Sequence, residues 1–307
     1  MPSGIIIRGI GGFYYVSSEE DGIYECKARG VFRLKELTPL TGDRVVFSVT
    51  DPQKKTGYIE EILPRDSVLV RPAAANVDQV IAVVAAKSPE PDLLLLDKIL
   101  VTAEKKEIRA VVLINKIDLD INDSRAEIRD SYTKAGYDVI ETSFEETSGF
   151  MMLRNIMKDH ISVFAGQSGV GKSTLLNRVM ENVVMKTGSV SKKIERGRHT
   201  TRHAELVKLP EGGYVVDTPG FSSYELSEID HTELQYLYPE FADHIPGCRF
   251  TGCSHISELG CGVKKAVDEG LISRGRYRRF AELYSILKQE SDMKYKKSNK
   301  RGTRNND

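Results

Sequence analysis

The hydrophobic pattern of the chain changes character along its length. From residue 5 to about residue 63, short runs rich in Val, Ile, Phe and Tyr alternate with Gly and Asp. These runs have the sequences GIIIRGI, GFYYV, DGIYECKA, VFRL, DRVVFSV and TGYIEEI. Short apolar runs bounded by turn residues are typical of β-strands, and five or six of them in a row indicate a small closed barrel. We therefore predict a β-barrel domain over residues 1–66.

After a connector at residues 64–76, continuous apolar runs alternate with amphipathic stretches. The runs DQVIAVVAA, AVVLI, YDVIETS, ISVFAG, HAELVKL and YVVDTPG predict strands, and DLLLLDKILVTAEKK and DSRAEIRDSYTKAG predict helices. Strands that are apolar throughout and separated by helices predict a parallel sheet covered on both faces, here over residues 67–222. Beyond this point GVKKAVDEGLI and RRFAELYSILKQES predict a mostly helical third domain, residues 223–307.

Length and composition are compatible with this division. A chain of 307 residues has room for two or three domains, each able to bury a core without disulfides. The longest apolar run is far shorter than the roughly 20 residues that span a bilayer, and the first residues lack the basic region of a secretory signal. We predict a soluble cytoplasmic protein with no membrane partner.

The sequence GQSGVGKS connects the predicted strand ISVFAG to a helical stretch, STLLNRVM. G-x-x-x-x-G-K-S in this context is a phosphate-binding P-loop. Its glycines let backbone N–H groups turn toward phosphate oxygens at a helix N-terminus, its lysine reaches the β and γ phosphates, and its serine binds Mg²⁺. The predicted phosphate-binding residues are Gly166, Gln167, Ser168, Gly169, Val170, Gly171, Lys172, Ser173 and Thr174.

A second phosphate motif, DTPG, ends the strand YVV. Its Asp217 would hold Mg²⁺ through water, and the N–H of Gly220 would contact the γ phosphate. The polar segment between the two motifs contains Thr200 and Thr201, one of which would bring a hydroxyl to the same Mg²⁺. The pattern does not distinguish between these two threonines.

The sequence NKID, at the end of the strand AVVLI, predicts the base that is bound. The carboxylate of Asp118 would accept hydrogen bonds from N1–H and the N2 amino group of guanine, while Asn115 faces O6 and N7 and the stem of Lys116 covers the ring. Adenine lacks those paired donors and would leave the carboxylate without partners. Ser143, in ETS at the end of the next strand, would support the base. The motifs together predict binding of GTP and GDP.

The base motif precedes the phosphate motif in the chain. Ligands of open α/β sheets bind at the C-terminal ends of strands, and each motif follows a predicted strand, so their order in sequence need not match their order in space. Domain termini often lie close together, which allows circular permutation. We therefore predict a circularly permuted P-loop GTPase domain whose DTPG motif leads directly into the third domain.

The position after the glycine of DTPG is held by Phe221, where many GTPases have a glutamine that orients the attacking water. Phenylalanine cannot do this, so we expect slow intrinsic hydrolysis. His199 is the best internal candidate for the catalytic group because it exchanges protons near neutral pH. Arg196, Arg198 and Arg202 flank it and would contact either phosphate or RNA.

Three of the four cysteines lie close together in the third domain. With one histidine they form the pattern C-x₄-C-x-H-x₅-C, which suits a closed tetrahedral site for structural zinc rather than a disulfide framework. The predicted ligands are Cys248, Cys253, His255 and Cys261. His231 and His244 are weaker candidates.

Two parts of the chain have the composition of nucleic-acid-binding surfaces. Basic and aromatic residues interleave in the barrel, as in oligonucleotide-binding (OB) barrels. The C-terminal segment is strongly basic through Arg274, Arg276, Arg278, Arg279, Lys288, Lys294, Lys296, Lys297, Lys300 and Arg301. Together with the metal module, these features favour RNA as a partner.

With these motifs assembled, the sequence resembles the ribosome small-subunit-dependent GTPase A family, which are circularly permuted bacterial GTPases. NKID before GQSGVGKST, then GRHTT, DTPGF and the cysteine and histidine spacing carry the resemblance over nearly the whole chain. It implies an OB-type barrel, GTP hydrolysis stimulated by the small (30S) ribosomal subunit, a role in late maturation of that subunit, and binding to 16S rRNA as a cytoplasmic monomer. His199 matches the histidine proposed for catalysis in that family.

Three functional hypotheses follow. In the first, GTP hydrolysis times the release of the protein from the assembling subunit. In the second, the protein is a GTP-gated RNA-binding checkpoint or scaffold that has little need of hydrolysis. The third, an ATP-using P-loop kinase, depends on residues 166–173 alone.

Overall fold

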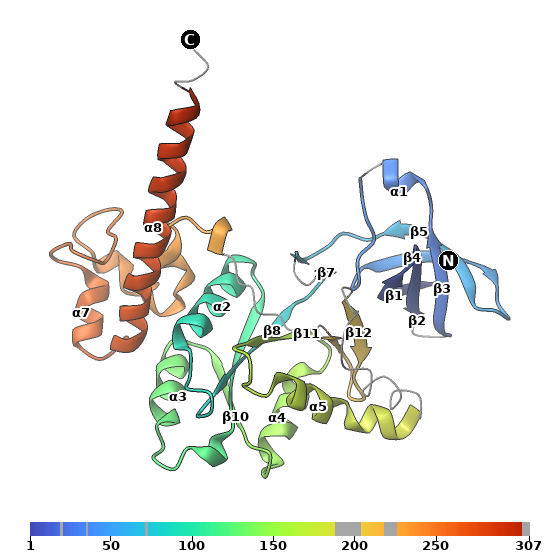
Figure 1. Cartoon of the computed structure of the whole chain (residues 1–307), viewed down its shortest axis with the longest axis horizontal. Coiled ribbons are helices and arrows are strands. Elements are labelled where there is room, and N and C mark those ends of the chain that lie inside the picture. Colours follow the sequence, from blue (N-terminus) through green and yellow to red (C-terminus); the bar gives the residue numbers. More distant parts are fainter. Residues whose placement is uncertain (19–20, 35, 71–72, 188–203, 218–225, 303–307) are drawn as a thin grey trace.

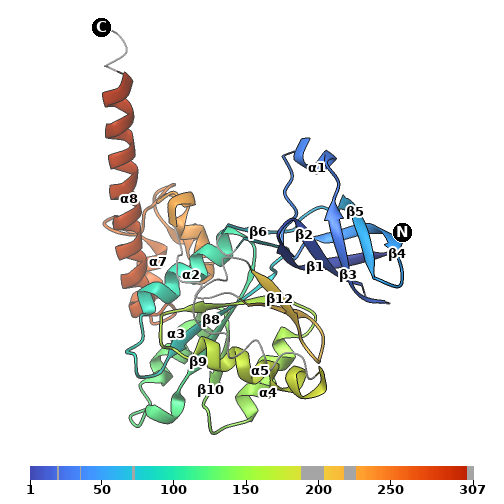
Figure 2. The ribbon, with the colours of Figure 1, turned by 45° about the vertical axis from the view of Figure 1, so that its right-hand side comes forward.

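A computed structural model of the chain describes residues 1–18, 21–34, 36–70, 73–187, 204–217 and 226–302. It shows a barrel and a helical region on opposite sides of a central sheet domain (Figure 1). A view turned by 45° shows the same order of the three bodies (Figure 2). The predicted three-part fold class is confirmed, whereas the boundaries at residues 66 and 222 stay predictions.

Five strands close the N-terminal barrel in the order β1-β2-β3-β5-β4. They are β1 (Ser3–Ile10), β2 (Phe13–Ser18), β3 (Gly22–Ala28), β4 (Arg44–Asp51) and β5 (Thr56–Ile62). Their inward side chains, among them Ile6, Val16 and Phe47, are completely buried. The predicted closed barrel is therefore confirmed.

One predicted strand of the barrel is wrong. The run VFRL forms the short helix α1 (Val31–Leu34), with Phe32 buried in the barrel core and Leu34 86% exposed. Both edges of β3 are already paired, with β2 and β5, so a strand at this position would have no free edge to join. The apolar composition of the run serves to close the barrel interior instead.

The central sheet has six strands in the order β10-β9-β8-β11-β13-β12. They are β8 (Gln79–Ala85), β9 (Arg109–Asn115), β10 (Asp138–Thr142), β11 (Ile161–Gly166), β12 (Glu205–Lys208) and β13 (Tyr214–Asp217). All neighbours are parallel except β12 and β13. The prediction of a parallel sheet fails for β12, because the few residues that join it to β13 can make a hairpin but not the long crossover that parallel pairing needs.

Two helices cover each face of the sheet. α2 (Leu93–Lys105) and α3 (Arg125–Lys134) pack on one face, and α4 (Ser148–Met157) and α5 (Lys172–Thr187) on the other. Along β8, alternate residues belong to the two cores, which is the period-2 alternation of a strand buried on both sides. α4 was not among the predicted helices, although its buried Phe150, Leu153 and Met157 have helical spacing.

The C-terminal region consists of short 3-10 helices followed by α7 (Gly262–Asp268) and α8 (Arg274–Gly302). The 3-10 helices are η2 (Leu226–Glu228), η3 (Leu234–Leu237), η4 (Pro239–Phe241) and η5 (Ile245–Gly247). α8 is the long helix that projects from the body toward the C-terminus (Figure 1). Among the described residues, no helix has the length and apolarity needed to cross a membrane.

A buried ionic cluster joins α8 to the sheet domain. Arg276 is 1% exposed, and its guanidinium donates to Asp97 of α2 at 2.6 Å and to Glu240 of η4. Arg279 also donates to Asp97, which accepts a further hydrogen bond from Tyr132 of α3 at 2.8 Å. Two arginines that were predicted to belong to an RNA-binding surface are thus committed to carboxylates inside the protein. That part of the prediction is wrong.

The barrel meets the sheet domain at strand β12. Thr41 donates to the carbonyl of Ala204 at 3.0 Å, and Arg8 forms an ion pair with Glu205 at 3.6 Å. The connector between the two domains forms a small hairpin of β6 (Val68–Leu69) and β7 (Ala74–Ala75). The barrel therefore rests on the strand that immediately follows the polar segment between the two phosphate motifs.

Candidate functional site

The predicted nucleotide motifs gather at one edge of the central sheet. β8, β9, β10, β11 and β13 run parallel, so their C-terminal ends share an edge. The chain adds β9 and β10 on one side of β8 and then returns to add β11 on the other side. Such a reversal of strand order opens a crevice where ligands of α/β sheets bind, and the P-loop follows β11 at this point.

The backbone of the P-loop requires glycine at two positions. Gly166 has φ +141°, and a Cβ there would lie 2.1 Å from the carbonyl oxygen of Val83 on the neighbouring strand. Gly171 has φ +99°, and a Cβ there would lie 2.5 Å from the side-chain nitrogen of Asn115. These glycines allow the loop to pack against β8 and the base motif, which any side chain would prevent.

Lys172 begins α5 and directs its ammonium group into the loop. Its Nζ donates to the carbonyls of Gly166 and Gln167, both at 2.7 Å. Burial lowers the pKa of Lys172 from its ordinary value. A phosphate in the loop would offer this ammonium group charged oxygens in place of neutral carbonyls, at the N-terminal end of a helix whose dipole also favours anions.

The base motif is joined directly to the P-loop. Asn115 donates through Nδ2 to the carbonyl of Val170 at 2.9 Å and accepts from the hydroxyl of Thr142 at 3.0 Å. Lys116, at φ +62°, donates through Nζ to the carbonyl of Gly169 at 2.8 Å. Motifs that occur in reversed order along the chain are therefore in contact in space, as the circular permutation requires.

Asn115 has a role that its motif did not predict. Its amide is buried and bridges the P-loop and the strand that ends in the base loop. Thr142, the other partner of this bridge, lies within ETS, so a hydroxyl residue at a predicted strand end was the available sequence signal. Contact between Asn115 and the guanine edge stays a prediction, as does the contact of Asp118, whose side chain is exposed at the same edge in η1 (Ile117–Leu119).

Ser143 lies at the start of the loop after β10 and is 2% exposed. Its hydroxyl accepts from the backbone N–H of Glu146 at 3.1 Å, which closes a turn of the loop. The side chain thus shapes the loop from within. The predicted supporting role of Ser143 for the base rests on this loop geometry and stays a prediction.

Two predicted Mg²⁺ ligands lie among the described residues. Ser173 is exposed in the first turn of α5, and Asp217 is exposed at the end of β13, which pairs with β11. Hydroxyl and carboxylate oxygens suit Mg²⁺, which would neutralise charge on the nucleotide phosphates when bound. The other predicted residues of this part of the site, His199, Thr200, Thr201 and Gly220, lie outside the described residues.

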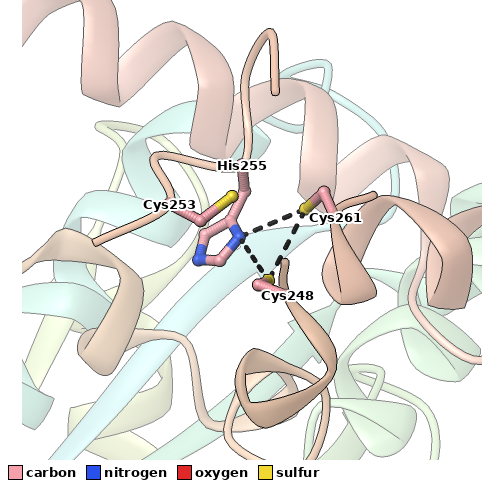
Figure 3. A group of neighbouring side chains, drawn as sticks. All are labelled: Cys248, Cys253, His255 and Cys261. Carbon is pink, nitrogen blue, oxygen red and sulfur yellow. Dashed lines mark hydrogen bonds between the residues drawn. The ribbon is translucent and has the colours of Figure 1, made fainter. Parts of the chain in front are cut away.

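The four predicted metal ligands converge in the C-terminal region. Their ligand atoms all lie within 4.8 Å of one another. Nδ1 of His255 is 3.3 Å from the sulfur of Cys261 and 3.6 Å from that of Cys248 (Figure 3). A tetrahedral zinc ion places neighbouring nitrogen and sulfur ligands about 3.5–3.8 Å apart, so this set can hold a metal such as zinc.

The surroundings of the cluster favour metal binding. Burial lowers the pKa of His255, which keeps the imidazole neutral and able to bind a cation. Burial raises the pKa of Cys253 to about 12, so a cation is needed to remove its proton near neutral pH. The backbone N–H of Lys264 donates to the sulfur of Cys261 at 3.4 Å, a contact that suits a thiolate.

Gln235 orients the histidine of the cluster. Its Oε1 lies 2.8 Å from Nε2 of His255, so that Nδ1 faces the sulfurs. Replacing Gln235 by leucine is expected to lower zinc affinity by about 10–100-fold, because a ligand whose outer hydrogen bond is lost is poorly oriented. Competition with a chromophoric chelator measures this. The exposed Gln289 of α8 supplies the control Gln289→Leu, and equal affinities for the two variants would contradict the prediction.

Comparison with known families agrees with this geometry. The sequence-family model described as RsgA GTPase matches residues 62–227. The family model described as RsgA N-terminal domain matches residues 3–59. The chain belongs to the RsgA GTPase family. Membership makes it a GTP hydrolase.

RsgA relatives align over almost the whole chain. A small ribosomal subunit biogenesis GTPase RsgA from Ruminiclostridium cellulolyticum is 57% identical over 302 residues, 98% of this chain and 99% of its own. The crystal structure of YloQ, a circularly permuted GTPase, is 38% identical with a TM-score of 0.81, covering 94% of this chain and 96% of its own. YjeQ from Thermotoga maritima is 39% identical with a TM-score of 0.79, covering 93% and 98%.

Proposed function

We propose that this GTPase acts in late maturation of the small ribosomal subunit, and that the subunit stimulates its GTP hydrolysis, which is coupled to release. The observation that carries the proposal is the RsgA relative that is 57% identical over 98% of the chain and is named for biogenesis of that subunit. The contact between base motif and P-loop supports the guanine nucleotide as the ligand. The proposed site consists of the predicted residues, with zinc in the cysteine cluster and Mg²⁺ accompanying GTP.

The flanking domains supply two surfaces for 16S rRNA. On the barrel, the ammonium of the exposed Lys27 lies 5.1 Å from the ring centre of Phe13. Such paired cations and aromatic rings suit bases and phosphates of RNA. The basic α8 projects on the other side of the sheet domain (Figure 1). A monomer that binds through both flanks would hold the GTPase domain between two rRNA contacts in the cytoplasm.

Hydrolysis by the isolated protein is expected to be slow. Phe221 stands where a glutamine would orient water, and the proposed catalytic residue His199 lies in the polar segment between the phosphate motifs. Contact with the subunit would place this histidine beside the attacking water. β12 follows this segment and contacts the barrel. A conformational change in the segment would therefore be transmitted through β12 to the barrel, which carries one of the proposed rRNA contacts.

The deciding experiment measures GTP hydrolysis with and without purified small ribosomal subunits. We expect the subunits to raise turnover by at least about tenfold, equivalent to 1.4 kcal/mol in the barrier. Asp118→Asn serves as the site variant: it replaces one of the two acceptor oxygens for guanine by an N–H donor and is expected to weaken discrimination of GTP from ATP in competition binding. Unchanged turnover in the presence of subunits would contradict the proposed coupling and leave the GTP-gated scaffold as the better account.

A further inference from the structure

One arginine of α5 holds the loop that follows β10. Nη1 of Arg178 donates to the carbonyl of Phe144 at 2.7 Å. The guanidinium carbon also lies 3.9 Å from the ring centre of Phe150 and 5.2 Å from that of Phe144. Phe144 directly follows Ser143. A single side chain therefore contacts the backbone and ring of Phe144, next to the proposed base-supporting residue, and the ring of Phe150 in α4.

These contacts are placed to fix a loop rather than to fill a core. The Phe144 side chain is 70% exposed, and Arg178 is half-buried at the surface between α5 and the loop. A charged guanidinium makes a stronger hydrogen bond to a carbonyl than a neutral donor does, and its stacking on Phe150 restricts where it can point. Arg178 thus restrains the Phe144 carbonyl, one residue beyond Ser143.

The same helix carries the phosphate-binding lysine. Arg178 follows Lys172 by six residues on α5, somewhat less than two helical turns. Arg154 of α4 donates to the backbone carbonyl of Arg178 at 3.0 Å and so ties this part of α5 to the neighbouring helix. One rigid element therefore holds the phosphate loop at its first turn and the base loop near its second.

We propose that Arg178 is a positioning residue for guanine selectivity, which it serves by holding the loop at Ser143 and Phe144 in the shape that lines the base pocket beside Asp118. This inference rests on the guanine-nucleotide site of the proposed function. A loop that is already ordered loses little conformational freedom when a base binds, whereas a loop released by loss of its anchor must be ordered by the ligand.

Replacing Arg178 by alanine is expected to raise the dissociation constant for GDP about tenfold, through the cost of ordering the loop on binding. The preference for GDP over ADP should fall by a similar factor, because the phosphate contacts are shared by both nucleotides. The value of kcat at saturating GTP should stay unchanged. Arg178→Lys keeps the charge but not the planar fork, and is expected to show an intermediate loss of about threefold. Titration with fluorescent GDP and ADP derivatives measures both constants.

Arg109→Ala is the matched control. Arg109 is exposed at the N-terminal end of β9, at the end of the strands away from the nucleotide motifs, and pairs there with Asp138 at 2.8 Å. If both Arg178 variants kept wild-type selectivity for GDP over ADP, this inference would be overturned while the proposed function would stand. So would an equal rise of the GDP and ADP constants together with a lower melting temperature, since that indicates general destabilisation. Should the alanine variant fail to fold, Arg178→Lys decides by the same comparison. Absence of guanine preference in the wild-type protein would instead refute the proposed function.

Discussion

Replacing Arg276 by alanine is expected to lower the free energy of unfolding by about 3–5 kcal/mol, the usual cost of removing one partner from a buried ion pair. Arg276 is 1% exposed and donates to two carboxylates, Asp97 and Glu240, that are themselves buried. Its guanidinium also lies 4.9 Å from the ring centre of Tyr132 and 4.8 Å from that of Tyr238. The alanine variant would leave Glu240 in a low-dielectric interior without its cation, and Asp97 with Arg279 as its remaining cation.

Because the cluster joins α8 to α2 and η4, the loss should fall first on the C-terminal region. Thermal unfolding and limited proteolysis measure this loss of stability. We expect a protease to cut the C-terminal region of the alanine variant sooner than that of the wild-type protein. Arg278→Ala is the control, since Arg278 lies two residues away on the same helix and is exposed. Equal melting temperatures of the two variants would show that the buried pair contributes little to holding the regions together.

Replacing Lys172 by methionine is expected to reduce kcat/KM for GTP by about 10²–10³-fold, the range found when one preorganised donor to a developing charge is removed. Within the part of the chain that the structure describes, the ammonium group donates to the carbonyls of Gly166 and Gln167 in the loop. Its removal therefore takes away the proposed phosphate ligand without opening a core. The melting temperature should change little, while binding and hydrolysis fall together.

The control for this variant is Lys158→Met, which changes an exposed lysine at the end of α4. Hydrolysis assays with saturating Mg²⁺ and subunits, alongside GDP titrations, separate the two effects. If Lys172→Met kept at least a third of wild-type kcat/KM, the ammonium group would not be a phosphate contact and the assignment of the P-loop would be wrong.

Much of the fold was predictable because it depends on local pattern. The alternating barrel strands and the continuous apolar strands of the sheet each show a period that reports burial on one face or on two. Two of the failures share a cause: α1 and the direction of β12 depend on which strand edges are free and how long a connection is. A run such as VFRL has the composition of a strand, and only the pairing of β3 with β5 excludes it.

The candidate site divides in the same way. Motifs with a fixed spacing, such as GQSGVGKS and the cysteine and histidine set, could be identified because one loop or turn brings their residues together. Residues that act on the site from other elements had no such signal. Gln235 contacts His255 across 20 positions, and Arg178 contacts Phe144 across 34. Many other pairs of residues in the chain have the same separation, so the spacing of these two pairs carries no signal of contact.

The sequence by itself determined most of the elements and the residue types of the loops, since both depend on neighbours within a few residues. The permuted order of the nucleotide motifs is likewise a property of the chain alone. Tertiary structure decided which side chains support these elements and loops. It buried Arg276 among carboxylates of other elements, although its surroundings in sequence are those of a basic surface helix. The physical reason is that burial and pairing depend on contacts between elements distant in sequence, and the local pattern of polar residues is the same whether those contacts form or not.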